Sequence, residues 1–463
     1  MDDAAKLSDP VDPRDARIAR LESQLAAALK RIAELEEIIS RLQRGGKRQA
    51  APFSKGPPKL NPKKPGRKSG GDYGTPPVFR AMPEPAAGDQ VIDVPPPEAC
   101  PACGGTQTVA DRTDQQVQRD IEVRTLVRRF VIRQVRCRRC GKIRRGKHPL
   151  QTSTATGCCA SQVGPLARAA MAFFNKALGV SLGKIAGVFD TLWDLPITAG
   201  GVSHAIQSIG RRCKGDYQAI VRKIKAAGHV TCDETGWRIG GIGHWLHAAA
   251  TPDTCAYLID KARGADATDQ LIGEDFSGTL VHDGFRSYGR YGKATHQQCL
   301  THLIRRCKEM IESAAVGAAV FPATIKAMLQ KALVLRDERD SRKRSLRSTR
   351  LWATKLTRKM LTLSKPRKTN CNNERLAAFL HRHANELFTF LRHPHTDATN
   401  WRGEHAMRQA VVNRKVWGGS RTRAGADVQA ILMSVMRTLK LREVNAVNWL
   451  QRKLLDQPRH ALA

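Results

Sequence analysis

The chain contains few acidic residues and no long apolar segment. Of its 463 residues, 42 are Asp or Glu and 78 are Lys or Arg, which gives a formal net charge of +36. No apolar run approaches the ~18 residues that a membrane-spanning helix needs, and this excludes an integral membrane protein. The excess of positive charge favours a polyanionic partner, with nucleic acid as the first expectation and peripheral binding to anionic lipid as the alternative.

Cysteine is too sparse, and the first residues are too polar, for a secreted protein. Twelve cysteines in a chain of this length do not make a disulfide scaffold. The first six residues, Met-Asp-Asp-Ala-Ala-Lys, precede no apolar segment and do not form a secretory signal. We therefore expect a cytoplasmic protein in which paired cysteines bind a metal ion.

A dimerisation helix is predicted within residues 1–43. Apolar residues recur there in alternating steps of three and four, at Ile18, Leu21, Leu25, Ala28, Ile32, Leu35, Ile39 and Leu42. Ile at position a and Leu at position d favour a parallel two-stranded coiled coil, in which Arg31 faces Glu36 of a partner helix. The chain is therefore expected to form a homodimer. The alternative is one long helix that packs against its own chain.

Residues 44–95 read as a basic linker rich in Pro and Gly. Such a segment cannot bury enough apolar surface to offset the entropy of ordering it. Its basic residues can follow phosphates or a minor groove, and the candidate DNA contacts are Lys63, Lys64, Arg67 and Lys68. The alternative is a tether that only keeps the chain soluble.

Two Cys-x-x-Cys pairs within residues 96–150 predict a zinc-binding ribbon. In such a pair two sulfur atoms on one tight turn reach the same ion, and two pairs complete a tetrahedral Zn²⁺ site. The four candidate ligands are Cys100, Cys103, Cys137 and Cys140. Between the pairs, the alternation of apolar residues from Ile121 to Ile132 predicts β-strand. Two unrelated redox pairs are the alternative.

Residues 151–226 are predicted to be helical. Two short amphipathic helices lie on either side of a break at residues 195–198, and Thr198 is placed to cap the second helix. This spacing fits a helix-turn-helix whose second helix enters a major groove of DNA. A plain helical connector fits the pattern equally well.

Two acidic residues follow short β-prone runs within residues 227–298. Asp233 ends the first run, and Asp283 ends another run after two further strands and a helix. This order of elements predicts the start of a ribonuclease H-like mixed α/β core, whose first and fourth strands lie side by side. The two carboxylates would then share a pair of Mg²⁺ ions, the arrangement that phosphodiester chemistry uses.

A third carboxylate is expected on a later helix. Glu404 and Arg408 are four residues apart, so a phosphate-binding guanidinium would lie beside a metal-bound carboxylate. Glu374 is a competing candidate, and an ordinary surface ion pair is the alternative for Glu404.

The order of these features resembles the bacterial insertion-sequence-66 transposases of the DDE class. The resemblance extends over nearly the whole chain. Its specific parts are Asp233-Glu-Thr, Asp283-Gly through Tyr288, Pro394 through Arg408, Asn413-Arg414-Lys415 and Gly419-Ser420-Arg421. It places the third carboxylate at Glu404 rather than Glu374. Trp401 departs from the family, which often repeats Asn at that position.

The resemblance also implies how the rest of the chain is divided. It predicts a first part of the catalytic core, a basic all-α insertion, a second part of the core and a C-terminal helical region, at residues 227–298, 299–395, 396–425 and 426–463. Cys299 and His302 form a Cys-x-x-His pair at the start of the insertion. We interpret this pair as structural packing, with a second metal site as the alternative, because two ligands do not complete a tetrahedron.

Composition and spacing alone predict a dimeric, zinc-containing DNA-binding protein with a phosphoryl-transfer site. The resemblance implies a nucleoid-associated transposase that uses Mg²⁺ or Mn²⁺ to cut element ends and join them to target DNA, with possible helper proteins and larger assemblies on DNA. Its expected DNA contacts in this region are Arg408, Arg414, Lys415 and Arg421. The alternative function is a non-catalytic dimeric regulator, or an inactive transposase copy, that binds element ends.

Overall fold

The computed structural model describes residues 13–47, 84, 86, 89–107, 109, 112–121, 125–157, 163–314, 317–365, 367–457, 459 and 462. The chain divides into two compact units, Ser54–Val127 and Met1–Phe53 together with Arg128–Ala463. The linker cations Lys63, Lys64, Arg67 and Lys68 lie outside the described residues. Within the described ranges, no helix is both long enough and apolar enough to cross a bilayer.

The heptad region forms one continuous helix, α1 (Pro13–Lys47). Its apolar stripe is open to solvent, with between 43% and 60% of each residue exposed at Ile18, Leu21, Leu25, Ile32 and Leu35. A second helix that covers such a stripe removes apolar surface from water. The helix is confirmed, and its pairing into a coiled coil stays a prediction.

The second cysteine pair lies at the tip of a short hairpin. Strands β1 (Gln134–Arg136) and β2 (Ile143–Arg145) pair antiparallel on either side of it. The strand expected between the two cysteine pairs is absent from the described residues of that segment. Ile121 and Val127 are 83% and 76% exposed there. Alternating apolar residues form a strand only when a neighbouring strand supplies hydrogen-bond partners, and no strand among the described residues pairs with this segment.

Four helices follow the hairpin: α2 (Pro165–Lys176), α3 (Leu182–Trp193), α4 (Ala199–Arg212) and α5 (Lys214–Lys225). Thr198 caps α4 as expected, because its Oγ1 accepts a hydrogen bond from Gly201 N at 3.1 Å. Val202, Ile206 and Ile209 are buried on the inner face of α4. These contacts hold α4 within the core, and a helix-turn-helix role for α3 and α4 stays a prediction.

The centre of the fold is a five-stranded mixed sheet with the strand order β5-β4-β3-β6-β7. Its strands are β3 (His229–Ile239), β4 (Ile242–Ala250), β5 (Cys255–Asp260), β6 (Thr279–His282) and β7 (Thr295–Gln298). β3, β4 and β5 pair antiparallel, whereas β6 and β7 run parallel to β3. Helix α6 (Ala265–Ile272) joins β5 to β6, and the short 3-10 helix η3 (Arg286–Arg290) joins β6 to β7. The expected mixed α/β class is confirmed.

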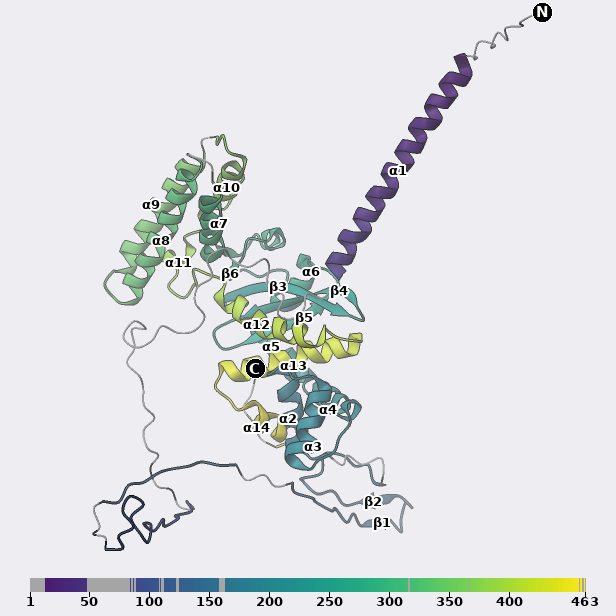
Figure 1. The fold of residues 1–463 in the computed structure, drawn as a ribbon, viewed down its shortest axis with the longest axis vertical. Coiled ribbons are helices and arrows are strands. Elements are labelled where there is room, and N and C mark those ends of the chain that lie inside the picture. Colours follow the sequence, from purple (N-terminus) through teal and green to yellow (C-terminus); the bar gives the residue numbers. More distant parts are fainter. Residues whose placement is uncertain are drawn as a thin grey trace, which may run out of the picture. The chain divides into compact units, whose positions relative to one another are not determined.

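Each face of the sheet is covered by a different set of helices (Figure 1). One face carries Val230 and Cys232 and packs against α5 and α6, and the hydrophobic core continues from there into α2 to α4. The other carries Trp237 and packs against α12 (Trp401–Trp417) and part of α13 (Arg423–Leu441). Because side chains alternate along a strand, Asp233 points to the α12 face and Glu234 to the opposite face.

Helix α13 also covers the free edge of the sheet. Thr438 Oγ1 and Ser434 Oγ accept hydrogen bonds from the backbone N–H groups of Cys255 and Tyr257, at 3.1 Å and 2.8 Å. An uncovered edge strand would present these groups to other chains. The boundary expected between residues 425 and 426 falls inside this helix, which runs across it without interruption. The helix reaches α14 (Ala446–Leu454), which packs on α2.

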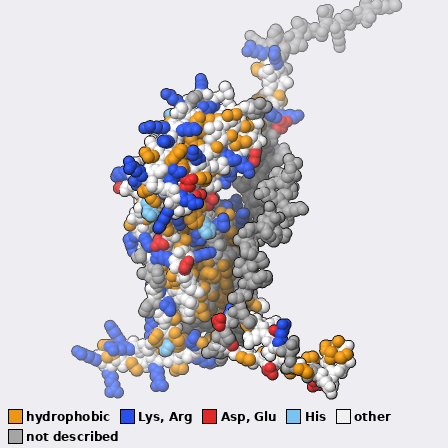
Figure 2. Space-filling model, turned by 90° about the vertical axis from the view of Figure 1, so that its left-hand side faces the viewer, with side chains coloured by type: hydrophobic (Ala, Val, Ile, Leu, Met, Phe, Trp, Pro, Cys, Tyr) orange, Lys and Arg blue, Asp and Glu red, His pale blue; other side chains and the backbone are white. Residues whose placement is uncertain are grey.

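A helical lobe is inserted between β7 and α12. It contains α7 (Leu300–Glu312), α8 (Val320–Asp340), α9 (Leu346–Ser364), α10 (Cys371–Arg382), η4 (Ala384–Glu386) and α11 (Thr389–Arg392). Leu329, Leu356 and Leu376 belong to a hydrophobic core of its own. Figure 2, which faces the side of α8 and α9, shows Lys and Arg side chains scattered over this lobe. Exposed basic residues of α9 include Arg347, Arg350, Lys355, Arg358 and Lys359.

The exposed stripe of α1 predicts that the chain dimerises through this helix. Replacing Leu25 and Ile32 together with Asp should give a monomer in analytical ultracentrifugation, because four charges would face one another in the seam of the dimer. The matched control replaces Ser23 and Lys30, which lie outside the seam, with Asp and should leave the dimer intact. A dimer that survives the seam changes would show that α1 is not the contact.

Candidate active site

Parallel pairing of β3 and β6 brings Asp233 and Asp283 together. Thr231 pairs with Val281 in this ladder, and each aspartate lies two residues further along its strand direction. The two carboxylates therefore leave neighbouring strands at the same level. The Asp283 charge also acts on Asp233, which agrees with this register.

The turn after β6 fixes the position of Asp283. Its Oδ1 accepts a hydrogen bond from Phe285 N at 2.9 Å, and His282 Nδ1 accepts one from Gly284 N at 3.1 Å. Gly284 has a φ of +92°, and a Cβ there would lie 2.7 Å from Gln298 Oε1. The turn therefore requires glycine at residue 284, and it holds the Asp283 carboxylate in place.

Glu404 is brought to the two aspartates by a close contact between α12 and β3. Glu404 lies in the first turn of α12, and its N–H donates to Asn400 O at 2.9 Å. A Cβ on the preceding Gly403 would lie 2.9 Å from Asp233 Cβ, which is closer than real side chains come. Only glycine allows the helix to approach the strand this closely.

The three carboxylates repel one another without a compensating cation. Burial and the charges of Glu234, Asp283 and Glu404 raise the pKa of Asp233 to about 7, against the opposing effect of the Glu234 N–H. Within the described part of the chain, no Lys or Arg forms an ion pair with Asp233, Asp283 or Glu404. His302 approaches the site, with its Nε2 3.7 Å from Glu404 Oε1. Such a set of oxygen donors fits a divalent cation.

Glu234, which neighbours Asp233 in sequence, has the opposite environment. Its Oε1 accepts two hydrogen bonds from Arg263, at 2.9 and 3.0 Å, and its Oε2 accepts one from Tyr288 Oη at 2.8 Å. The Arg263 guanidinium lies over the rings of Trp245 and Phe285, with 4.5 and 3.9 Å to their centroids. Glu234 is therefore neutralised and held in place, and it is not free to bind a metal ion.

Sequence reasoning did not find this network. The Asp-Glu-Thr motif drew attention to Asp233, and nothing in the sequence linked Glu234 to Arg263, which is 29 residues further along. Tyr288, the last residue of the second motif, is buried and its hydroxyl donates to Glu234. Alternation along β3 was the available signal, because it separates the side chains of residues 233 and 234.

The four cations expected to contact DNA, at and after α12, have different environments. Arg408, Lys415 and Arg421 are exposed. Arg414 instead donates hydrogen bonds to Thr235 Oγ1 and to the carbonyl oxygen of Gly236, and so attaches α12 to β3. The exposed cations can reach a polyanion, whereas Arg414 stabilises the arrangement of the site.

The two cysteine pairs have the same local geometry but lie in different compact units. Gly104 N donates to Cys100 O at 2.8 Å, and Gly141 N donates to Cys137 O at 2.9 Å. Both glycines have positive φ, +75° and +69°. Backbone N–H groups lower the pKa of the thiols of Cys100 and Cys137, so each turn favours the thiolate. A metal site shared by the two pairs stays a prediction.

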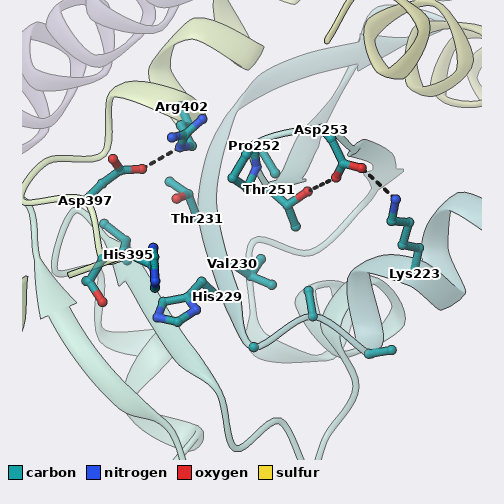
Figure 3. A pocket seen from close by; sticks show the side chains of 16 residues that line it. Lys223, His229, Val230, Thr231, Thr251, Pro252, Asp253, His395, Asp397 and Arg402 are labelled. Atoms are coloured by element: carbon teal, nitrogen blue, oxygen red, sulfur yellow. Dashed lines mark hydrogen bonds and ion pairs between the residues drawn. The ribbon is translucent and has the colours of Figure 1, made fainter. Parts of the chain in front are cut away.

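A cavity of about 470 Å³ opens at the start of β3 (Figure 3). Thr231 lines it and lies on the same face of the strand as Asp233, two residues away. Both carboxylates in its wall are already paired with a cation: Asp253 with Lys223 at 2.6 Å and Asp397 with Arg402 at 2.5 Å. The cavity therefore lacks the uncompensated acids found at Asp233.

Comparison with known proteins identifies one matching family model. The model described as "Transposase IS66 family" matches residues 160–428, more than half of the chain. This range contains the whole five-stranded sheet, the helical lobe and α12. No curated protein matches the chain.

The raised pKa of Asp233 predicts that this carboxylate destabilises the metal-free fold. A folded-state pKa above the unfolded value means that ionisation costs stability from about pH 4 upward, and the full cost applies above about pH 7. Asp233→Asn should therefore raise the melting temperature in EDTA near pH ~8, by at least the ~2–4 °C that ~1 kcal/mol produces in a domain of this size. The gain should vanish toward pH ~4.

Glu234→Gln is the matched control and should have the opposite sign, because it leaves Arg263 without its counter-charge. Thermal unfolding followed by circular dichroism measures both effects. A lower melting temperature for Asp233→Asn near pH ~8, or a gain that does not change with pH, would contradict the electrostatic explanation.

Proposed function

The chain belongs to the IS66 transposase family, and we propose that it cuts the ends of a DNA insertion element and joins them to target DNA with Asp233, Asp283 and Glu404. The observation that carries the proposal is the meeting of these acids on one face of the sheet, through the register of β3 with β6 and the contact at Gly403. Family membership supports DNA as the substrate.

The topology of the sheet supports a ribonuclease H-like core. Three antiparallel strands are followed by two strands parallel to the first, in the order β5-β4-β3-β6-β7. In such a core, carboxylates at the first and fourth strands and on a later helix form one site. Asp233, Asp283 and Glu404 occupy these three places. The helical lobe then interrupts the core between β7 and α12.

The three carboxylates would hold Mg²⁺ or Mn²⁺. When bound, a pair of such ions activates the attacking oxygen and stabilises the leaving oxygen of a phosphodiester. The uncompensated charge of the acids and the raised pKa of Asp233 support this reading, because a divalent cation removes the repulsion that the metal-free site contains. Asp233 must lose its proton before it can act as a ligand.

The proposed reaction has two steps, and each step forms one phosphorus–oxygen bond and breaks another. Water first adds to the phosphorus at the element end, and the 3′ oxygen leaves as a hydroxyl. That hydroxyl then attacks a phosphorus of the target and displaces its 3′ oxygen. The exposed guanidinium of Arg408, one helical turn after Glu404, is placed to bind a phosphate during both steps. Lys415 and Arg421 extend the cationic surface for DNA.

Replacing Glu404 with Gln tests the proposal most directly. The amide keeps the size of the side chain, and it should lower cleavage and strand transfer by at least about 10³-fold, since a metal centre contributes several kcal/mol to the transition state. DNA affinity in a gel-shift assay should stay within about threefold, because no phosphate-binding cation is lost. The substrate is DNA that flanks the gene and carries its terminal inverted repeats, incubated with Mg²⁺.

Glu374→Gln is the matched control, since Glu374 also lies in the first turn of a helix but accepts a hydrogen bond from Lys368 N at 2.7 Å. It should cut at the native rate. Cleavage by Glu404→Gln at the native rate would overturn the assignment of the third carboxylate. Binding without metal-dependent cutting by the native chain would favour a regulator instead.

The four paired cysteines would hold one structural Zn²⁺. Their thiols lie on two turns of the same geometry, and backbone N–H groups support a thiolate in each. Four thiolates form a closed tetrahedral zinc site. The ribbon would then position the basic side chains within and directly after the second pair, Arg138, Arg139 and Lys142, against DNA.

Loss of any one of these cysteines should therefore release the same ion. Cys103→Ser and Cys140→Ser should each lower the zinc content by one equivalent per chain in mass spectrometry of the native protein. Cys371→Ser is the control, because Cys371 is an exposed cysteine outside the pairs. If one change removes zinc and the other does not, the two pairs do not share an ion.

A further inference from the structure

A second group of metal-binding donors adjoins the carboxylate site. Cys299, His302 and Glu404 each offer one ligand atom, and these atoms lie within 4.8 Å of one another. Cys299 is the residue before α7, His302 lies in the first turn of that helix, and Glu404 lies in the first turn of α12. Two helix beginnings thus place sulfur, nitrogen and oxygen donors at one point.

Cys299 is held rigidly in this group. It is 1% exposed, and its Sγ accepts a hydrogen bond from Asn400 N at 3.1 Å. Leu300 N donates to Ala398 O at 3.1 Å, which ties the beginning of α7 to the segment before α12. The spacing between Cys299 and Glu404 is therefore set by the backbone.

Unpartnered polar atoms surround the same point. His302 Nδ1 is buried and has no hydrogen-bond partner. Asn400 is 0% exposed, and neither polar atom of its side chain has a partner. A buried polar group without a partner costs about 1–3 kcal/mol, so these groups indicate a bound ion or its water ligands.

The other cluster of this kind in the described part of the chain differs in this respect. It contains His282, His296 and Glu386. His282 Nε2 and His296 Nδ1 are 3.0 Å apart, and His296 Nε2 is 2.9 Å from Tyr291 O. Gln298 Nε2 donates to Glu386 Oε2 at 2.5 Å. The donors of this cluster are used by one another, and it needs no ion.

We propose that Cys299, His302 and Glu404 bind a borderline-soft divalent cation of the Zn²⁺ class, with one coordination position left open. A thiolate and an imidazole select such an ion over Mg²⁺, which prefers oxygen donors only. Three protein ligands and one open position are the usual composition of a zinc site that exchanges its fourth ligand.

Sharing of Glu404 links this site to the carboxylate site. A carboxylate held by Zn²⁺ on the Cys299 side is not available beside Asp233 and Asp283. This part of the inference rests on the proposed function. Occupancy by Zn²⁺ therefore inhibits Mg²⁺-dependent cleavage, and excess Mg²⁺ competes against the inhibition.

Zinc binding by the full-length protein tests the site without reference to catalysis. In equilibrium dialysis with Zn²⁺ alone, His302→Gln and Cys299→Ala should each bind one equivalent less per chain than the native protein. Loss of a ligand should weaken the Zn²⁺ affinity by more than about 100-fold. Changes at residues that only contact a ligand weaken metal affinity by up to about that factor. Cys307→Ala, at a buried cysteine of the same helix, is the matched control and should keep the equivalent. Equal zinc content in native protein and in His302→Gln would overturn the proposal.

Inhibition tests the link to Glu404. Zn²⁺ should inhibit cleavage by the native protein at a concentration at least about tenfold lower than it inhibits His302→Gln, each relative to its own rate without zinc. Zinc that binds at Cys299 and His302 without inhibiting would show that Glu404 is not shared. If no chain cuts DNA under any condition, the proposed function fails, and the dialysis result still decides whether the zinc site exists.

Discussion

The close contact of α12 with β3 is the constraint on which the candidate site depends. Gly403 has no side chain, and the space that a Cβ would need is taken by Asp233 and Asn400. This contact brings an acid from a distant helix onto the face of the sheet where Asp233, within β3, and Asp283, directly after β6, already lie. Arg414 attaches the same helix to β3 further along. Packing and hydrogen bonds of the surrounding structure thus hold the three carboxylates together against their mutual electrostatic repulsion.

Sequence patterns could predict the elements of the core and could single out the two aspartates, because both follow short β-prone runs. The run before Asp233 is expected to end at this residue, whereas β3 continues to Ile239 because it pairs with β4 along that length. The third acid could be ranked above Glu374 only through a family resemblance. Patterns could not predict that Gly403 permits the helix to approach, since steric contact between distant segments leaves no periodic signal. For the same reason the pairing of Cys299 with Glu404 could not be foreseen from their positions.

Two neighbouring acids in β3, Asp233 and Glu234, have different environments because side chains alternate between the two faces of a strand. Asp233 faces α12 and has no cation, whereas Glu234 faces η3 and is bound by Arg263 and Tyr288. Glu234 is paired with Arg263, although its charge still contributes to the raised pKa of Asp233. The Arg263 guanidinium also lies over the rings of Trp245 and Phe285, which hold it in place beside Glu234. The hydrogen-bonded network of Glu234, Arg263 and Tyr288 therefore lies on the face of the sheet opposite to Asp233.

The position of the helical lobe in the chain has a consequence for protein synthesis. The lobe has its own hydrophobic core and lies between the strands that carry the aspartates and the helix that carries Glu404. During translation the sheet and the lobe leave the ribosome first, and α12 follows. A nascent chain consequently lacks the complete set of acids until α12 has been synthesised. The order of the segments thus delays assembly of the candidate site until the helical lobe has been synthesised.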